Sequence, residues 1–279
     1  MTLFDASVWV GRWPFRPAAL TLPALEARLR AHGVEGACVA PVAAVLAPDP
    51  LPLSLALCRA AGRRRRGFRW VPAAIIDPSL AGWEGGAAAC LRLGARCLKV
   101  VPNYHLYPVV AGGTVSGVAP WVPRAADGGL RGLDALCRLA ADSGVPVAVQ
   151  MRLQDERTHH PLMRVPAVPA REVAALAARH PDARFLACAC FLGDLAALGA
   201  AANVWVELSH VEGRDTLVDA LRHVPAGRLL VGSHSPLLYT AAAVAKVESA
   251  GAPVEVREAV AHGNADRLWP ADGGPGTWH

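Results

Sequence analysis

Residues 3–10 read LFDASVWV, an almost continuous apolar run that Gly11 follows. A run of this kind predicts a β-strand buried on both faces, as in a parallel sheet covered by helices. Such a strand often carries the pattern Asp-x-His-x-His, in which both histidines bind a metal ion. Here Ser7 and Trp9 stand at the two histidine positions. The strand therefore either lost a metal site or never had one.

Seven further apolar segments follow the first, and a helical pattern follows each of them. The predicted strands span residues 36–42, 68–76, 96–102, 146–153, 183–190, 203–210 and 228–234. Eight strand-helix units in one chain predict an α/β fold, a single (β/α)8 TIM barrel, rather than an open doubly wound sheet. No linker or change of composition divides the chain, so we expect residues 1–279 to form one domain.

The composition fits one large barrel. Hydrophobic residues make up 53% of the 279 residues and charged residues 18%, which allows a sizeable core and argues against general disorder. No apolar run reaches the roughly 18 residues of a membrane span, and the N-terminal residues lack a secretory pattern. We therefore expect a cytoplasmic protein with no membrane partner and with seven buried free cysteines.

The net charge of +5 is modest, and one dense run of arginines occupies residues 63–66. No aromatic residues are interleaved with this run, so a solvated helix end is the better interpretation and no nucleic-acid partner is expected.

The carboxyl ends of barrel strands converge on the mouth, where such barrels place their active sites. The candidate catalytic residues at these ends are His234, His105, Lys99 and Gln150. The candidate substrate-binding residues are Arg12, Arg16, Asn103, Arg152, Arg157, His210 and Ser233.

Each of these candidates has a structural alternative. Lys99 lies inside an apolar strand, where an unpaired ammonium would be costly, so it is either functional or part of a buried ion pair. His105 could cap a loop at the rim. The stretch RLQDERTHHP (152–161) could be a solvated loop held by salt bridges, and His234 could pack against its neighbours in space that a metal left.

Four motifs occur in order along residues 3–269: FDASVWVG, LKVVPNYHLYP, VGSHSP and HGNADRLW. On eight strand-helix units they resemble the amidohydrolase superfamily, specifically its amidohydrolase-related branch of metal-dependent barrels. The resemblance implies a metal held by two histidines of the first strand, one histidine each from the fifth and sixth strands, and an aspartate of the eighth.

The positions of these metal ligands carry other residues in this chain. They are Ser7, Trp9, Gln150, residues 188–190 and His234. Serine and glutamine are poor ligands for zinc, and an indole N–H donates but cannot accept. We therefore expect no metal site and no other cofactor. The blocks GRWPFR, RLQDERTHHPL and GSHSP also resemble a subgroup of this branch that lacks the metal ligands.

The resemblance favours a metal-independent hydrolase or lactonase acting on a small carboxylate-bearing substrate. Arginines at the mouth are suited to clamping a carboxylate. Lys99, Arg152 and Gln150 would polarise the carbonyl, and His105 or His234 would activate water.

Two other interpretations remain open. A catalytically silent barrel that binds a ligand or a partner would also explain the changed metal positions. Alternatively, His105, His210 and His234 could rebuild a metal site, as in a decarboxylase or a metal-dependent hydrolase. The sequence leaves the oligomeric state open, a homo-oligomer included.

Overall fold

The computed structural model describes residues 1–15, 18–63, 67–113, 126–160 and 164–270. Arg16, one of the predicted substrate-binding residues, and residues 64–66 of the arginine run lie outside these ranges.

One curled sheet forms the centre of the molecule, with the strands in the order β2-β1-β3-β4-β5-β6-β7-β8-β9. Parallel pairing joins β1 (Leu3–Trp13), β3 (Val34–Pro41), β4 (Arg69–Ile75), β5 (Cys97–Val100), β6 (Val147–Gln150), β7 (Phe185–Cys188), β8 (Val204–Glu207) and β9 (Leu229–Leu230). The eight predicted strands are all present, and the predicted (β/α)8 barrel is confirmed. The additional strand β2 (Ala18–Leu20) pairs antiparallel with the end of β1.

Hydrogen bonds between β1 and the segment after β9 close the sheet into a barrel. They run from Ala6 N–H to Val231 O (2.7 Å), from His234 N–H to Ser7 O (2.8 Å) and from Trp9 N–H to Ser235 O (2.7 Å). The eighth barrel strand therefore continues beyond the two residues of β9, as the predicted range 228–234 implies.

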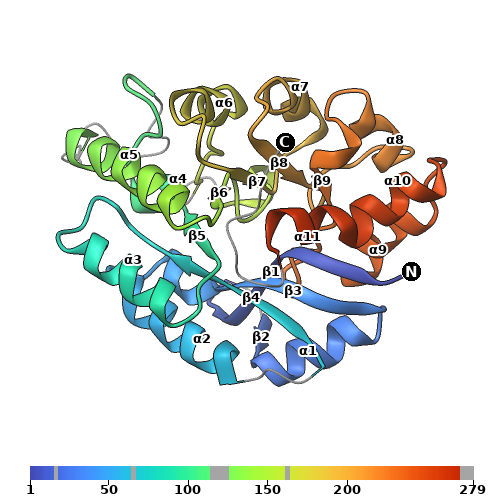
Figure 1. Cartoon of the computed structure of the whole chain (residues 1–279), viewed down its shortest axis with the longest axis horizontal. Coiled ribbons are helices and arrows are strands. Elements are labelled where there is room, and N and C mark those ends of the chain that lie inside the picture. Colours follow the sequence, from blue (N-terminus) through green and yellow to red (C-terminus); the bar gives the residue numbers. More distant parts are fainter. Residues whose placement is uncertain (16–17, 64–66, 114–125, 161–163, 271–279) are drawn as a thin grey trace.

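Helices surround the sheet, with α2 and α3 on the opposite side of the strands from α6 and α7 (Figure 1). The longer helices are α1 (Leu22–Arg30), α2 (Leu51–Arg63), α3 (Trp83–Arg92), α5 (Ala126–Asp142), α6 (Ala170–Arg179) and α9 (Thr240–Glu248). The shorter ones are α4 (Pro102–His105), α7 (Leu195–Gly199), α8 (Thr216–Leu221), α10 (Val254–Glu258) and α11 (Asn264–Leu268). In the described part of the chain, no helix has both the length and the apolar character needed to cross a bilayer.

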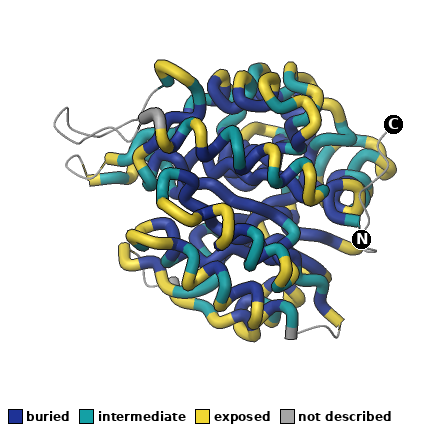
Figure 2. Tube along the Cα trace, turned by 60° about the vertical axis from the view of Figure 1, so that its left-hand side comes forward, coloured by how far each residue is buried: buried dark blue, intermediate teal, exposed yellow. Residues whose placement is uncertain are grey.

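Buried residues occupy the strands and the inner faces of the helices (Figure 2). Alternate strand residues point outward to the helices and inward to the barrel. Many of the side chains in the inner cluster are small, among them Ala6, Cys38, Ala40, Ala73, Cys97, Ala148 and Cys188. They leave room for the indole of Trp9. The seven cysteines are all buried and free, as predicted.

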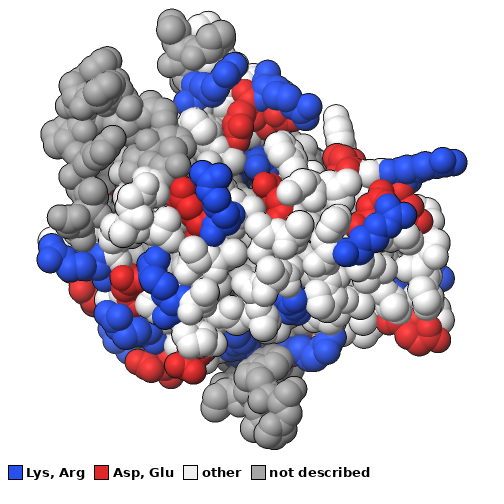
Figure 3. Space-filling model, turned by 90° about the horizontal axis from the view of Figure 1, so that it is seen from above, with Lys and Arg blue, Asp and Glu red and all other residues white. Residues whose placement is uncertain are grey.

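The surface carries charges of both signs. On the face drawn in Figure 3, basic and acidic side chains lie beside one another and form no large patch of one sign.

Asp5 stabilises the closure of the barrel. It is buried, and its Oδ1 accepts hydrogen bonds from the backbone N–H groups of Ser233 (2.9 Å) and Ser7 (3.2 Å). Burial raises the pKa of Asp5 to about 7, although these hydrogen bonds oppose the shift. The folded protein therefore binds a proton that the unfolded chain has released above about pH 4. The contribution of Asp5 to stability consequently falls as the pH rises from about 4 to 7.

The substitution Asp5→Asn should remove this loss of stability. The amide oxygen accepts the same two N–H groups and carries no charge at any pH. The unfolding free energy of the variant relative to the wild type should therefore rise by about 2–4 kcal/mol between pH 5 and pH 8. Urea denaturation at both pH values measures it. Asp182→Asn, at an exposed position, is the control, and a difference that does not change with pH would contradict the prediction.

Candidate active site at the mouth of the barrel

The indole of Trp9 fills the centre of the barrel. Trp9 is fully buried, and its Nε1–H donates a hydrogen bond to His234 Nδ1 at 3.1 Å. The ammonium of Lys99 lies 4.2 Å from the centroid of the indole ring. A desolvated cation–π contact of this kind is worth about 2 kcal/mol. Trp9 stands where the family that the sequence resembles has its second histidine. It therefore fills the barrel interior and contacts a cation instead of binding a metal.

His234 uses both of its ring nitrogens. Because Nδ1 accepts from Trp9, the ring proton lies on Nε2, which donates to the carbonyl oxygen of Leu153 at 2.8 Å. The side chain is fully buried, and the backbone adopts a left-handed conformation with φ 55°. In this conformation the predicted catalytic histidine holds the loop after β6 onto the barrel centre, and its catalytic role stays a prediction.

The residues at the metal positions do not fit a divalent cation. His234 has no ring nitrogen to offer, and Gln150 Nε2 donates to Arg152 O at 2.6 Å. The Lys99 ammonium lies 3.9 Å from Cys188 Sγ, where a second cation would be repelled. Burial raises the pKa of Cys188 to about 12, which keeps the thiol protonated and a poor ligand. Within the described ranges, no group of three or more His, Cys, Asp or Glu side chains could hold a metal.

The His105 side chain is almost fully buried beneath the rim. Its Nε2 is 3.5 Å from Ala44 O, and its Nδ1 is 3.9 Å from a carboxylate oxygen of Asp77. Burial lowers the pKa of His105, although Asp77 opposes the shift. Its predicted role as a base is not tested by this placement.

Arg152 is committed to a neighbouring loop. Its guanidinium donates to Asp194 Oδ2 from both terminal nitrogens (3.2 Å each) and to Ala189 O, and it lies 3.8 Å from the ring centroid of Phe191. A substrate carboxylate would have to displace Asp194. In this structure the Arg152 side chain therefore stabilises the loop after β7.

The other predicted substrate-binding residues do not gather at one point. Arg12 is exposed on β1, and Ser233 is buried, where its Oγ accepts from Ser235 N–H at 3.1 Å. Arg157 is exposed and pairs with Asp155 at 2.6 Å. This pairing holds the pKa of Asp155 at about 2. Among the described arginines and lysines, Arg157 alone lines a cavity of about 650 Å³ at the mouth.

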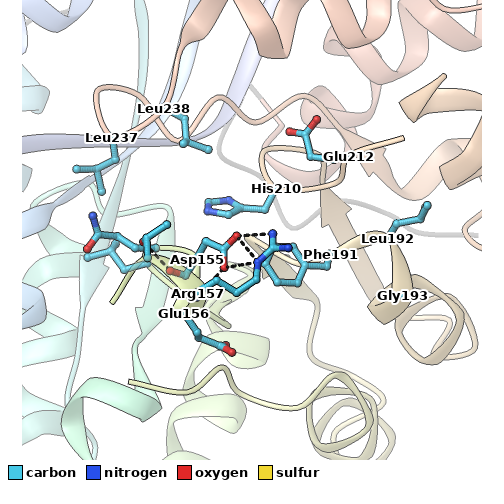
Figure 4. A pocket seen from close by; sticks show the side chains of 13 residues that line it. Asp155, Glu156, Arg157, Phe191, Leu192, Gly193, His210, Glu212, Leu237 and Leu238 are labelled. Atoms are coloured by element: carbon cyan, nitrogen blue, oxygen red, sulfur yellow. Dashed lines mark hydrogen bonds and ion pairs between the residues drawn. The ribbon is translucent and has the colours of Figure 1, made fainter. Parts of the chain in front are cut away.

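The larger cavity, of about 650 Å³, lies between the loops that follow β6, β7, β8 and β9 (Figure 4). Its apolar walls include Leu153, Phe191, Leu192, Leu237 and Leu238, and its polar groups include Gln154, Asp155, Arg157, His210 and Glu212. A mostly apolar cavity with a few convergent polar groups is the usual form of a small-molecule site.

A chain of hydrogen bonds fixes His210 at this cavity. The buried carboxyl of Glu207 accepts from the Ser209 backbone N–H (2.6 Å) and from the Ser209 hydroxyl (2.9 Å). The Ser209 Oγ lies 2.9 Å from His210 Nδ1. Because the hydroxyl has one proton, which Glu207 receives, Ser209 must accept the bond from His210 Nδ1–H. His210 Nε2 is therefore unprotonated, and it has no hydrogen-bond partner among the described residues.

Burial, together with the positive charges of Arg152 and Lys246, lowers the pKa of His210 to about 4. The imidazole is therefore neutral near pH 7 and can accept a proton. The sequence interpretation placed His210 among the substrate-binding residues and did not find the contact through Ser209. The spacing of Glu207 and Ser209, two positions apart at a strand end, was the available signal. The sequence interpretation also missed Gln154, because a glutamine in this loop does not by itself indicate a functional residue.

Trp9→Phe should be more destabilising than Trp13→Phe. Both indoles are buried, but the Nε1–H of Trp13 has no hydrogen-bond partner among the described residues, whereas that of Trp9 binds His234. Loss of the donor leaves a buried imidazole nitrogen unpaired, so Trp9→Phe should cost about 1–3 kcal/mol more in unfolding free energy. Urea titrations of the two variants provide the comparison, and equal losses would show that the hydrogen bond contributes nothing.

No family model matches the sequence, and no curated protein is found to be similar to it. Solved structures with the same fold include 5-carboxyvanillate decarboxylase from Sphingomonas paucimobilis, at 14% identity and a TM-score of 0.68, with 96% of this chain and 98% of that chain covered. A dihydroxybenzoic acid decarboxylase from Polaromonas, with bound manganese and the inhibitor 2-nitroresorcinol, has 15% identity and a TM-score of 0.66 over 100% and 99%.

An amidohydrolase from Mycobacterium avium is also similar, at 17% identity and a TM-score of 0.55, with 88% of this chain and 73% of that chain covered. At these identities the likeness concerns the fold. The chain therefore has the barrel architecture that is found in this amidohydrolase and in the two decarboxylases.

Proposed function

We propose that the protein is an enzyme that hydrolyses a small ester or lactone in the larger cavity, without a metal and with His210 as the general base. The supporting observation is the chain Glu207–Ser209–His210, which leaves an unprotonated Nε2 on a histidine that lines a mostly apolar cavity. A neutral imidazole oriented through its other nitrogen is suited to taking a proton from water.

In this mechanism His210 Nε2 removes a proton from water as the water oxygen bonds to the substrate carbonyl carbon. Glu207 and Ser209 hold the ring and stabilise the imidazolium that forms. The proton then passes to the leaving oxygen as its bond to carbon breaks. The Gln154 amide lines the same cavity and has no hydrogen-bond partner among the described residues, so we assign it as the donor to the oxyanion. One such donor contributes about 3–4 kcal/mol in the transition state.

The carboxylate expected on the substrate requires a cation. Arg157 would have to exchange Asp155 for it, and Arg152 would have to exchange Asp194. The geometry therefore favours neutral esters over the carboxylated substrates that the sequence suggested, and both classes belong in a substrate screen.

A decarboxylase is the second candidate, because two of the structural neighbours described above are decarboxylases. Decarboxylation needs a site for the carboxylate and an acid that protonates the carbon. With a pKa of about 4, His210 is unprotonated near pH 7 and has no proton to give to that carbon. Release of CO₂ from a dihydroxybenzoate, measured beside ester hydrolysis, separates the two candidates.

His210→Asn should abolish most of the hydrolysis. The asparagine amide can still donate to Ser209 but cannot act as a base, so kcat should fall by about a hundredfold or more. A panel of p-nitrophenyl esters and lactones, assayed with a chelator, supplies the substrate. His223→Asn changes an exposed histidine and should leave kcat unaltered. Turnover by His210→Asn at the wild-type rate would refute the role of this base.

The pH profile should show the low pKa of His210. Because the neutral ring is the active form, kcat/KM should stay level down to about pH 5 and fall about tenfold per pH unit below about pH 4. The unfolded chain binds this proton from about pH 6.5, so the contribution of His210 to stability falls as the pH drops from about 6.5 to 4. Circular dichroism at each pH shows whether the fold persists. An acid limb near pH 6.5 in the folded protein would contradict the low pKa of His210.

A further inference from the structure

A second cavity, of about 480 Å³, lies at the same end of the barrel. Its lining residues follow β1, the 3₁₀ turn after β3 (Val42–Val45), β5 and β6. It shares Gln154 and Thr158 with the larger cavity. The two cavities therefore adjoin at the residue that we assign as the oxyanion donor.

Three aromatic rings form a frame at this second cavity. The Trp13 ring contacts Phe15 edge-on (centroids 5.4 Å apart, 70° between planes) and Tyr104 (6.3 Å, 81°). Phe15 is 55% exposed, and the nearby Leu46 and Leu106 are also exposed. Large apolar side chains that gather in the open at a concave site indicate a bound apolar group. Edge-on rings favour a flat aromatic group over an aliphatic one.

Two polar groups at this cavity have a ring nitrogen or an oxygen with no hydrogen-bond partner among the described residues. His159 Nδ1 accepts the Val165 backbone N–H at 3.3 Å, so its Nε2 carries the ring proton and is a donor. The Nδ2 of Asn103 donates to Met151 O and Pro166 O (3.2 Å each), while its Oδ1 has no hydrogen-bond partner in the described ranges. Asn103 is only 6% exposed, and an unpaired buried acceptor is costly. A polar substituent on a bound ring would interact with these groups.

We propose that the second cavity binds an aryl group of the substrate, one that carries both a hydrogen-bond acceptor and a donor, while the scissile ester lies beside His210 in the larger cavity. This inference rests on the proposed function for the ester and on the second cavity alone for the ring. The substrate class is therefore aryl-substituted neutral esters or lactones that extend across Gln154.

Benzamide and cyclohexanecarboxamide test the ring site by themselves, because they share an amide and differ in aromaticity. Titration calorimetry or saturation-transfer NMR should show benzamide binding more tightly to the wild type by about fivefold. Phe15→Ala should weaken benzamide by a similar factor, whereas Tyr239→Ala, which removes an aromatic side chain that is 82% exposed and lines neither cavity, should not. Equal affinities for the two amides, or unchanged benzamide binding by Phe15→Ala, would overturn the proposal.

Two further measurements separate this proposal from the proposed function. His210→Asn should bind benzamide as the wild type does, so normal Phe15-dependent binding without ester hydrolysis would end only the hydrolase assignment. Where hydrolysis is found, Phe15→Ala should raise KM about fivefold for a phenyl-bearing ester, leave kcat unchanged and spare the cyclohexyl analogue. Hydrolysis that depends on His210 with equal KM effects on both esters would end only the aryl site.

Discussion

The hydrogen bond from Trp9 to His234 in the barrel centre is the contact on which the mouth of this protein depends. It joins the first strand to the segment after β9, beside the backbone bonds that close the barrel. Because it occupies Nδ1 of His234, the other nitrogen must donate to Leu153 O, which anchors the loop after β6. That loop then supplies Gln154, which lines both cavities. The buried contact between Trp9 and His234 thus supports both the closure of the barrel and the position of the loop that carries Gln154.

Lys99 connects the barrel centre to the proposed base. Its ammonium lies against the Trp9 indole. Burial raises the pKa of Glu207, and the hydrogen bonds from Ser209 and Ala189 and the charge of Lys99 oppose this rise. A carboxylate is the form that best accepts the two Ser209 hydrogen bonds. The cation inside the barrel therefore favours the state of Glu207 that orients His210. This arrangement gives a physical reason for a lysine inside an apolar strand, without requiring that it contact a substrate.

The sequence predicts the barrel well because eight apolar runs each need burial on both faces. It predicts strand ends less well: β5 ends at Val100, earlier than the apolar run does, and β2 is too short to carry a pattern. Less of the candidate site follows from the sequence. Strand order places Lys99 and His210 at the carboxyl ends, but the depth and orientation of a side chain depend on distant partners. Nothing near Arg152 in sequence indicates that Asp194 will occupy its guanidinium.

A filled centre also determines where chemistry can occur. With the Trp9 indole on the barrel axis, a substrate cannot reach the strand interior, so reacting groups must come from just beyond the strand ends. His210 lies three positions beyond the last residue of β8 and meets this requirement, while Glu207 at the strand end supports it from below. Two cavities at the mouth meet at Gln154, and this arrangement suits an elongated molecule that lies across the barrel better than a compact one that enters it.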